Sequence, residues 1–149
     1  MNKVVFISDF FLEEVRGGAE FCNDALISLL GEDIEILKIK SQQVNLNFVS
    51  SNQDSFFVVA NFFMLSEDIK SALKNTTYVI LEHDHKYVKS NNPSLYRNFL
   101  APESQIQNKS FYRNALAVLC QSKKHASVVQ RNLLLNNIVS FRTKNIALM

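Results

Sequence analysis

The stretch VVFISDFFLEEVRGGAEFCNDALISLLG, residues 4–31, contains the two signals that predict the fold of this chain. Residues 4–8 form a short, continuous apolar run that ends at Asp9, which is typical of a strand buried on both faces of a parallel sheet. Residues 18–30 then repeat apolar side chains at helical spacing, and Gly31 follows as a C-cap. This order of strand, loop and helix is the first part of a β-α-β unit.

The rest of the chain repeats this alternation. Further strands are predicted at residues 34–39, 56–62, 76–83, 115–121 and 138–141, and helices at residues 66–74, 105–114 and 122–135, the last one closed by Asn136 and Asn137. The polar segment 84–107 is expected to be a functional excursion with some helix near residues 93–99. We therefore expect an α/β fold over residues 1–149, a single Rossmann-like three-layer domain with a mostly parallel sheet of about six strands and helices on both faces.

Length and composition predict a soluble, cytoplasmic protein. The 149 residues are 47% hydrophobic and 20% charged, as in ordinary globular domains. Cys22 and Cys120 are far apart in the sequence and are predicted as small hydrophobic residues in a reducing compartment. No apolar run approaches the length of a membrane-spanning helix, and the first residues do not resemble a signal peptide.

The charges of the chain are divided between its two halves. Residues up to His85 include 6 Lys and Arg and 13 Asp and Glu, whereas the residues from Lys86 onward include 10 Lys and Arg and a single acid, Glu103. This asymmetry predicts an anionic partner for the second half. The alternative is that the fold mixes the two halves, so that their fields cancel.

Gly17 and Gly18 open the first predicted helix, directly after the loop that follows the first strand. Without Cβ atoms, a ligand can reach the first N–H groups of a helix, and the helix dipole favours an anion there. The pair lacks the third glycine of a dinucleotide-binding fingerprint and the lysine of a P-loop. The alternative is a tight turn that requires a positive φ, with Glu20 only complementing the dipole.

The segment EHDHKY, residues 82–87, places His83 and His85 on one face of the chain if the strand persists through them. One of them could bind a ligand hydroxyl or carbonyl as a hydrogen-bond donor or as a general base. A zinc site would require a third ligand, and none is placed at a recognisable spacing. The third alternative is a polar strand end that caps neighbouring loops.

The segment QSKKHA, residues 121–126, begins the last predicted helix. Lys123 and Lys124 lie in its first turn, where the dipole disfavours each cation by up to ~1 kcal/mol. An anion bound between Ser122 and the two lysines would offset this cost. The alternative is that both lysines are solvated and screened by salt.

Three segments together resemble the N-terminal domain of a retaining glycosyltransferase of the GT-B fold, of the family-four type. They are KVVFISDFF…GGAE within residues 3–20, YVILEHDHKY at 78–87 and AVLCQSKKHASVVQRNL at 117–133. The three segments span nearly the whole chain in the order that the family has.

The resemblance implies roles for residues at the strand ends. Gly17 and Gly18 would approach the phosphate or the transferred sugar of a nucleotide-sugar, and His83 or His85 would line the reaction centre as the catalytic histidine. The other candidate substrate or phosphate contacts are Glu20, Asp84, Lys86, Ser122, Lys123 and Lys124. In that family a second domain binds the nucleotide-sugar. We expect that this donor-binding C-terminal domain is absent, that the chain is inactive alone, and that it holds no metal or cofactor of its own.

Two functions are therefore predicted. The first is the acceptor-side half of a nucleotide-sugar-dependent glycosyltransferase, with a sugar or glycoconjugate acceptor as its ligand. Its expected partners are a separate donor-binding domain or chain, a second copy in a homodimer, or a membrane surface touched by the basic half. The second is a stand-alone, flavodoxin-like module that binds a phosphate-bearing small molecule. Nucleic-acid binding is the weakest prediction, because the aromatic residues of the basic half do not alternate with its cations in a recognised module.

Overall fold

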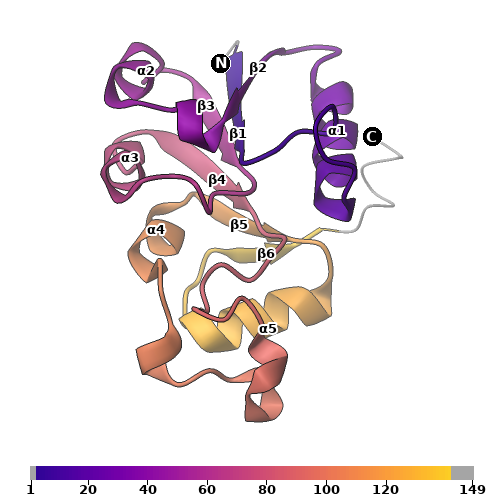
Figure 1. Ribbon diagram of the computed structural model, residues 1–149, viewed down its shortest axis with the longest axis vertical. Helices are drawn as coiled ribbons and strands as arrows, with labels where there is room; N and C mark the ends of the chain where they lie inside the picture. Colours follow the sequence, from indigo (N-terminus) through magenta and orange to yellow (C-terminus); the bar gives the residue numbers. More distant parts are fainter. Residues whose placement is uncertain (1–2, 142–149) are drawn as a thin grey trace. The chain divides into compact units, whose positions relative to one another are not determined.

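The computed structural model of the protein describes residues 3–141 of the chain. Its six strands form one parallel sheet in the order β2-β1-β3-β4-β5-β6 (Figure 1). The strands are β1 (Lys3–Ser8), β2 (Glu35–Lys40), β3 (Phe56–Val59), β4 (Thr77–Leu81), β5 (Ala117–Cys120) and β6 (Ile138–Ser140). The predicted α/β class with a six-stranded parallel sheet is confirmed, and the fold is Rossmann-like.

Five α-helices and four short 3-10 turns connect the strands within the described residues. The helices are α1 (Gly18–Leu30), α2 (Leu46–Ser51), α3 (Glu67–Leu73), α4 (Lys109–Asn114) and α5 (Lys123–Leu133). The 3-10 turns are η1 (Ser41–Gln43), η2 (Pro93–Leu95), η3 (Arg97–Phe99) and η4 (Glu103–Gln105). No helix among the described residues is both long and apolar enough to cross a membrane.

The chain divides into two compact units, Met1–Val79 and Ile80–Met149. The first unit carries 6 Lys and Arg and 11 Asp and Glu, whereas the second carries 10 and 3. Each charge imbalance therefore stays within one compact unit and is not cancelled inside it. That residues 1–149 act as a single domain stays a prediction.

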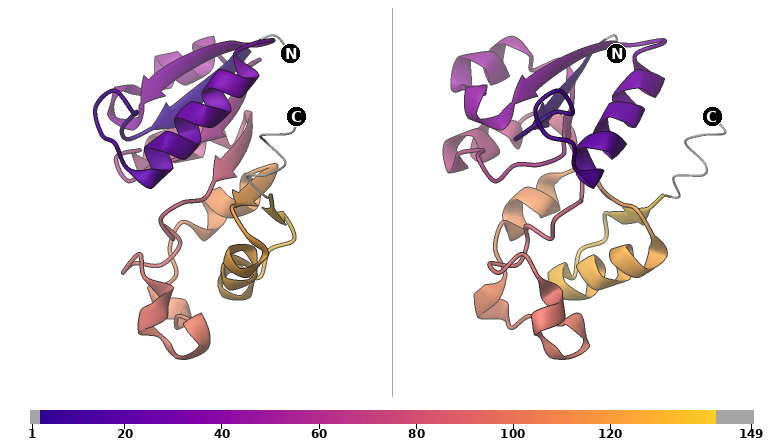
Figure 2. Two further views of the ribbon diagram at one scale, coloured as in Figure 1. Left: turned by 90° about the vertical axis from the view of Figure 1, so that its right-hand side faces the viewer. Right: turned by 45° about the vertical axis from the view of Figure 1, so that its right-hand side comes forward.

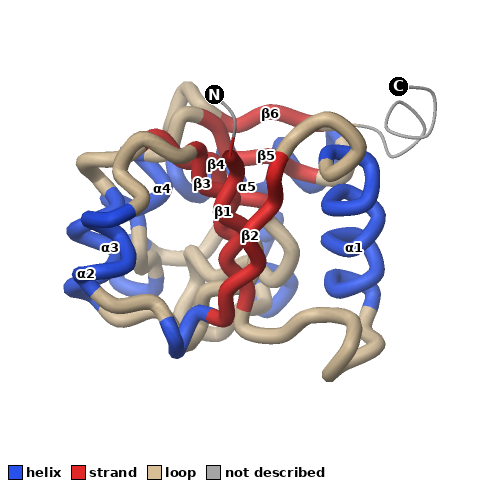
Figure 3. Tube along the Cα trace, turned by 90° about the horizontal axis from the view of Figure 1, so that it is seen from above, coloured by secondary structure: helices blue, strands red, loops and turns tan. Residues whose placement is uncertain are grey.

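In the first unit, β1 pairs in parallel with β2 on one side and with β3 on the other. Its central residues are fully buried, as the continuous apolar run predicts. Helix α1 lies on one face of these strands, and α2 and α3 lie on the opposite face (Figure 3). The deepest side chains of α1 are the polar Glu20 and Asn23, whereas its predicted apolar face is only partly buried.

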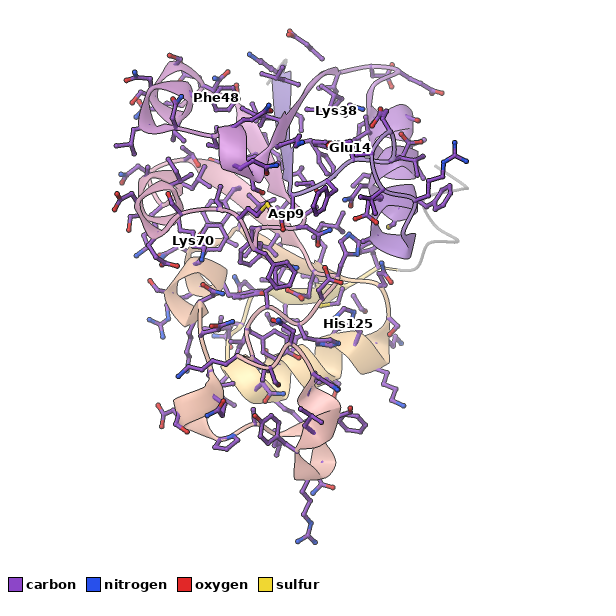
Figure 4. The ribbon with its side chains drawn as sticks, viewed as in Figure 1. Asp9, Glu14, Lys38, Phe48, Lys70 and His125 are labelled. Atoms are coloured by element: carbon purple, nitrogen blue, oxygen red, sulfur yellow. The ribbon has the colours of Figure 1, made fainter. Side chains whose placement is uncertain are left out.

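The strand order reverses between β1 and β3, which is the position where ligands bind in many open parallel sheets. Here the chain itself bridges the two strand ends. The carboxylate of Asp9, labelled in Figure 4, accepts hydrogen bonds from the N–H groups of Phe63 at 2.8 Å and Met64 at 3.0 Å. Asp9 is only 2% exposed. The loop after β3 therefore uses the polar group that ends β1.

In the second unit, β5 and β6 pair in parallel, and α5 contacts both strands. The Oγ of Ser122 accepts a hydrogen bond from the N–H of His125 at 3.0 Å, so Ser122 is the N-cap of α5. The helix ends at Leu133, earlier than predicted. Leu134 has a left-handed φ of 55° and donates its N–H to Gln130, so this residue stops the helix instead of Asn136 and Asn137.

The excursion between β4 and α4 is a series of loops and short turns (Figure 2). Asn132 on α5 holds it in place, because its Oδ1 accepts from the N–H of Ala101 and its Nδ2 donates to the carbonyl of Phe99. The helix predicted from residue 105 begins only at Lys109, since Asn108 before it is left-handed with φ 58°. The expected helix near residues 93–99 is a pair of 3-10 turns.

Candidate functional site

A pocket of about 300 Å³ lies in the second unit, beyond the carboxyl ends of β4 and β5. Three segments line it: the loop after β4, the excursion and the first turns of α5. The lining residues are His85, Asn92, Pro93, Ser94, Phe99, Ser122, Lys124, His125 and Val128. Its volume is at the lower end of the range for small-molecule pockets. Ligands of parallel sheets bind at this edge, so the pocket is the candidate site.

Helix α5 supplies the polar floor of the pocket. Ser122 and Lys124 line it, whereas Lys123 does not, although both lysines are exposed. The two lysines, which the sequence does not distinguish, therefore differ in their position relative to the pocket. The positive end of the helix dipole and the Lys124 ammonium both favour a bound anion here.

His85 lines the pocket from the other side, in a backbone conformation that few residues adopt. Strand β4 ends at Leu81, and His85 follows in a turn with φ 51°. The expectation that His83 and His85 share one strand face is therefore wrong. The Nδ1 of His85 is 2.8 Å from the hydroxyl of Tyr87, and burial lowers the pKa of His85, so that the ring is neutral near pH 7.

His125, labelled in Figure 4, lies on the first turn of α5 beside His85. The two ring centroids are 4.8 Å apart. Burial is the main cause that lowers the pKa of His125, and the neighbouring His85 lowers it further. Its Nε2 is buried and has no hydrogen-bond partner within the described chain. Two neutral imidazoles therefore lie side by side at the pocket.

His83 lies outside the set of lining residues. Its Nδ1 is 3.0 Å from the Nε2 of Gln121, and this contact joins the end of β4 to the end of β5. Burial, followed by the positive charge of Lys86, lowers the pKa of His83 to about 4. The sequence does not show which of His83 and His85 belongs to the site. In the structure, His85 lines the pocket.

Asp84 and Lys86 are also absent from the pocket lining. The side chain of Lys86 is 1% exposed, and its Nζ is 3.7 Å from Oδ2 of Asp84. The prediction that Lys86 contacts a phosphate therefore does not hold for this pocket, because the side chain packs inward. Its backbone carbonyl accepts from the side chains of Gln107 and Asn108, which anchors the end of the excursion.

A buried polar pair lies next to the site and was not predicted. Glu82 is fully buried, and its Oε2 accepts a hydrogen bond from the hydroxyl of Tyr112 at 2.5 Å. The other carboxylate oxygen, Oε1, has no partner among the described residues. The ring of Tyr112 packs edge-on against Tyr87, which in turn contacts His85. Tyr87 and Tyr112 thus connect the turn at His85 to the buried Glu82.

Sequence reasoning also missed the wall that the excursion builds. Phe99 has φ 60°, which is rare for a bulky side chain, and it lines the pocket together with Asn92 and Ser94. No local pattern predicts such a conformation. The one available signal was the length of the polar segment 84–107, because long loops often carry function.

The glycine pair lies in the first unit, where Gly17 is the N-cap of α1 with φ −95°. No glycine has a positive φ, so the tight-turn interpretation of the pair is wrong. A Cβ at Gly17 would overlap Oε2 of Glu20, whereas a Cβ at Gly18 would meet nothing within 4 Å. Glu20 fills the space that Gly17 leaves, and the space beside Gly18 is open.

This difference predicts opposite effects of alanine at the two positions. Gly17→Ala should destabilise the protein by about 1 kcal/mol, because alanine is a poor N-cap and its methyl group would displace Glu20. Gly18→Ala should be neutral or stabilising by about 0.5 kcal/mol, since it reduces the entropy of the unfolded chain. Urea denaturation of both variants measures the difference. Equal destabilisation by the two substitutions would contradict it.

No three His, Cys, Asp or Glu side chains of residues 3–141 come together as ligands for a metal ion. No protein-family model matches the chain, and no curated protein matches it. A function for this chain is therefore inferred from its fold and from the geometry of the pocket.

Proposed function

We propose that this chain is the acceptor-side half of a nucleotide-sugar-dependent glycosyltransferase and that its acceptor binds in the pocket of the second unit. The observation that carries the proposal is the convergence of His85, His125 and Lys124 at the carboxyl ends of two parallel strands. The Rossmann-like fold is also the one that the resemblance implies.

In this proposal the residues of the chain bind and orient an acceptor. Lys124 and the N-terminus of α5 attract a negatively charged group, and the neutral imidazole of His85, which packs against His125, forms a hydrogen bond with a ligand oxygen. The apolar side chains of Phe99, Pro93 and Val128 pack against the rest of the acceptor. The nucleotide-sugar would be bound by a separate domain or chain, so the protein alone should not turn over sugar.

A stand-alone module that binds a phosphate-bearing small molecule is the second candidate. It is favoured by one observation, that the residues lining the pocket all come from the second unit. Such a pocket can bind a ligand without any other chain.

A titration tests both candidates. Glucose 6-phosphate, glucose, UDP, GDP and UDP-glucose would each be added to the 15N-labelled chain, and amide shifts would be followed. Under the first proposal, glucose 6-phosphate shifts the amides of Ser122–His125 and the nucleotide-sugar leaves them unchanged. Shifts of the same amides by every phosphate-bearing compound, UDP and GDP included, would favour the stand-alone module, since that function requires a phosphate and no sugar acceptor. If no compound shifts them at millimolar concentration, both functions are wrong for this pocket.

A further inference from the structure

We propose that the pocket is lined by hydrogen-bond donors that receive a phosphate monoester, and that Tyr87 holds His85 in the tautomer that donates its N–H at Nε2. The ligand class deepens the proposed function and depends on it. The role of Tyr87 as a positioning residue does not depend on it, because the tautomer exists before any ligand binds.

The assignment of the tautomer begins with the hydroxyl of Tyr87. Tyr87 is 0% exposed, so no solvent can accept the hydroxyl proton. Within the described chain, the hydroxyl has one hydrogen-bond partner, Nδ1 of His85 at 2.8 Å. A buried phenol that only accepted a hydrogen bond would leave its own O–H unsatisfied, which is costly. Tyr87 therefore donates to Nδ1, and Nδ1 carries no proton.

A neutral imidazole has a single N–H, so the proton of His85 is on Nε2. This atom has no hydrogen-bond partner among the described residues and is not among their buried unsatisfied atoms. Because His85 lines the pocket, its Nε2–H is accessible to a ligand. The left-handed turn at His85 and the contact with Tyr87 together restrict the orientation of the ring.

Three other polar groups of the pocket can donate to a ligand, whereas the hydroxyl of Ser94 donates to Oδ1 of Asn92 and can only accept. Lys124 has an ammonium group, and Ser122 accepts from the N–H of His125, so its hydroxyl proton remains for a ligand. Oδ1 of Asn92 accepts from the N–H of Ser94 at 3.1 Å, which leaves the amide N–H₂ of Asn92 as its donor.

No Asp or Glu is among the residues that line the pocket in the described part of the chain. A cation or a neutral polyol would require acceptors, and this set offers few. A phosphate monoester has three terminal oxygens and only accepts hydrogen bonds when it is fully ionised, so it matches the donors. The apolar side chains of Phe99 and Pro93 leave room for the carbon skeleton of the ester.

The first experiment is a long-range 1H–15N NMR spectrum of the histidine rings in the ligand-free chain near pH 7. We expect a pyrrole-type nitrogen at Nε2 of His85 and a pyridine-type nitrogen at Nδ1, assigned by their loss in His85→Gln. In Tyr87→Phe the Nδ1 shift should change and a population with the proton on Nδ1 should appear. A wild-type ring with its proton on Nδ1 would overturn the role of Tyr87, whatever the pocket binds.

The second experiment is a double-mutant cycle that measures the binding of glucose 6-phosphate. Glucose and inorganic phosphate, the two parts of this ligand, are titrated for comparison. Tyr87→Phe should weaken binding about three- to tenfold in the wild-type background. In the His85→Gln background it should have no effect, because the glutamine amide keeps its N–H without Tyr87. An equal loss in both backgrounds would show that Tyr87 acts only through the fold.

The two experiments separate the two proposals. A Nε2–H ring together with no binding of glucose 6-phosphate would retain the role of Tyr87 and reject the phosphate site. Binding of glucose as tight as that of glucose 6-phosphate would reject the monoester as the ligand class. Urea denaturation of Tyr87→Phe and His85→Gln checks that each variant is folded at the temperature of the titration.

Discussion

Lys124→Glu should weaken the binding of glucose 6-phosphate at least about tenfold, because it replaces a charge-assisted hydrogen bond by repulsion between two anions. Lys124 lines the pocket at the start of α5, where the helix dipole also favours the ligand phosphate. A hydrogen bond of this kind contributes about 1.5–3 kcal/mol, which is one to two orders of magnitude in affinity.

Lys123→Glu is the matched control for this variant. It makes the same change in net charge and places a carboxylate in the same helical turn, but Lys123 does not line the pocket. Its effect on affinity should remain within about threefold at 0.15 M salt, where solvent ions screen exposed charges. Isothermal titration calorimetry of both variants gives the comparison. Equal losses of affinity in the two variants would mean that only the overall positive charge of the second unit attracts the ligand, and that this pocket does not bind it.

Tyr112→Phe should destabilise the protein by about 2–4 kcal/mol, the largest effect on stability that we expect from the loss of one atom. The hydroxyl of Tyr112 donates to Oε2 of Glu82 at 2.5 Å, and Glu82 is fully buried with its other oxygen unpartnered. Removal of the hydroxyl leaves a buried carboxyl group without its hydrogen bond. The free energy needed to remove this carboxyl group from water is then no longer offset. Urea denaturation at pH 7 measures the loss.

A second substitution tests this explanation. Glu82→Met removes the carboxyl group and keeps a similar volume, so the double variant Tyr112→Phe, Glu82→Met should recover most of the lost stability. If the double variant is as unstable as the sum of the two single variants, the hydroxyl contributes through packing, and the buried carboxyl group is not the cause. Tyr87→Phe provides a comparison, because its hydroxyl bonds to a neutral ring and its loss should cost only about 1 kcal/mol.

Most of the fold could be predicted because its signals are local. The burial of β1 on both faces follows from the continuous apolar run of residues 4–8. The starts of α3 and α5 follow from the hydroxyls of Ser66 and Ser122, which cap these helices. These caps act over three residues, so a single sequence contains all the information that they need. The boundaries of helices were less predictable, as the left-handed Leu134 at the end of α5 and Asn108 before the start of α4 show, because the tertiary structure can require a turn there.

The candidate site could be predicted only in part. The sequence indicated the right strand ends, the loop after β4 and the start of α5, because parallel strands place these segments at one edge. It could not separate His85 from His83 or Lys124 from Lys123. Within each pair, the residue types are the same and the spacing is short, so only the direction of the backbone distinguishes them.

The alternation of strands and helices, and with it the parallel sheet, follows from local sequence patterns. Apolar periodicity and capping chemistry are properties of neighbouring residues. Which polar groups meet depends instead on the packing of the folded chain. The turn at His85 brings its ring to the hydroxyl of Tyr87, and Asn132 ties the excursion to α5, so that Phe99 closes one wall of the pocket. The contact of Asn132 joins segments that are distant in the chain, and the contact of His85 with Tyr87 depends on a left-handed turn, so the geometry of both depends on how the whole unit packs.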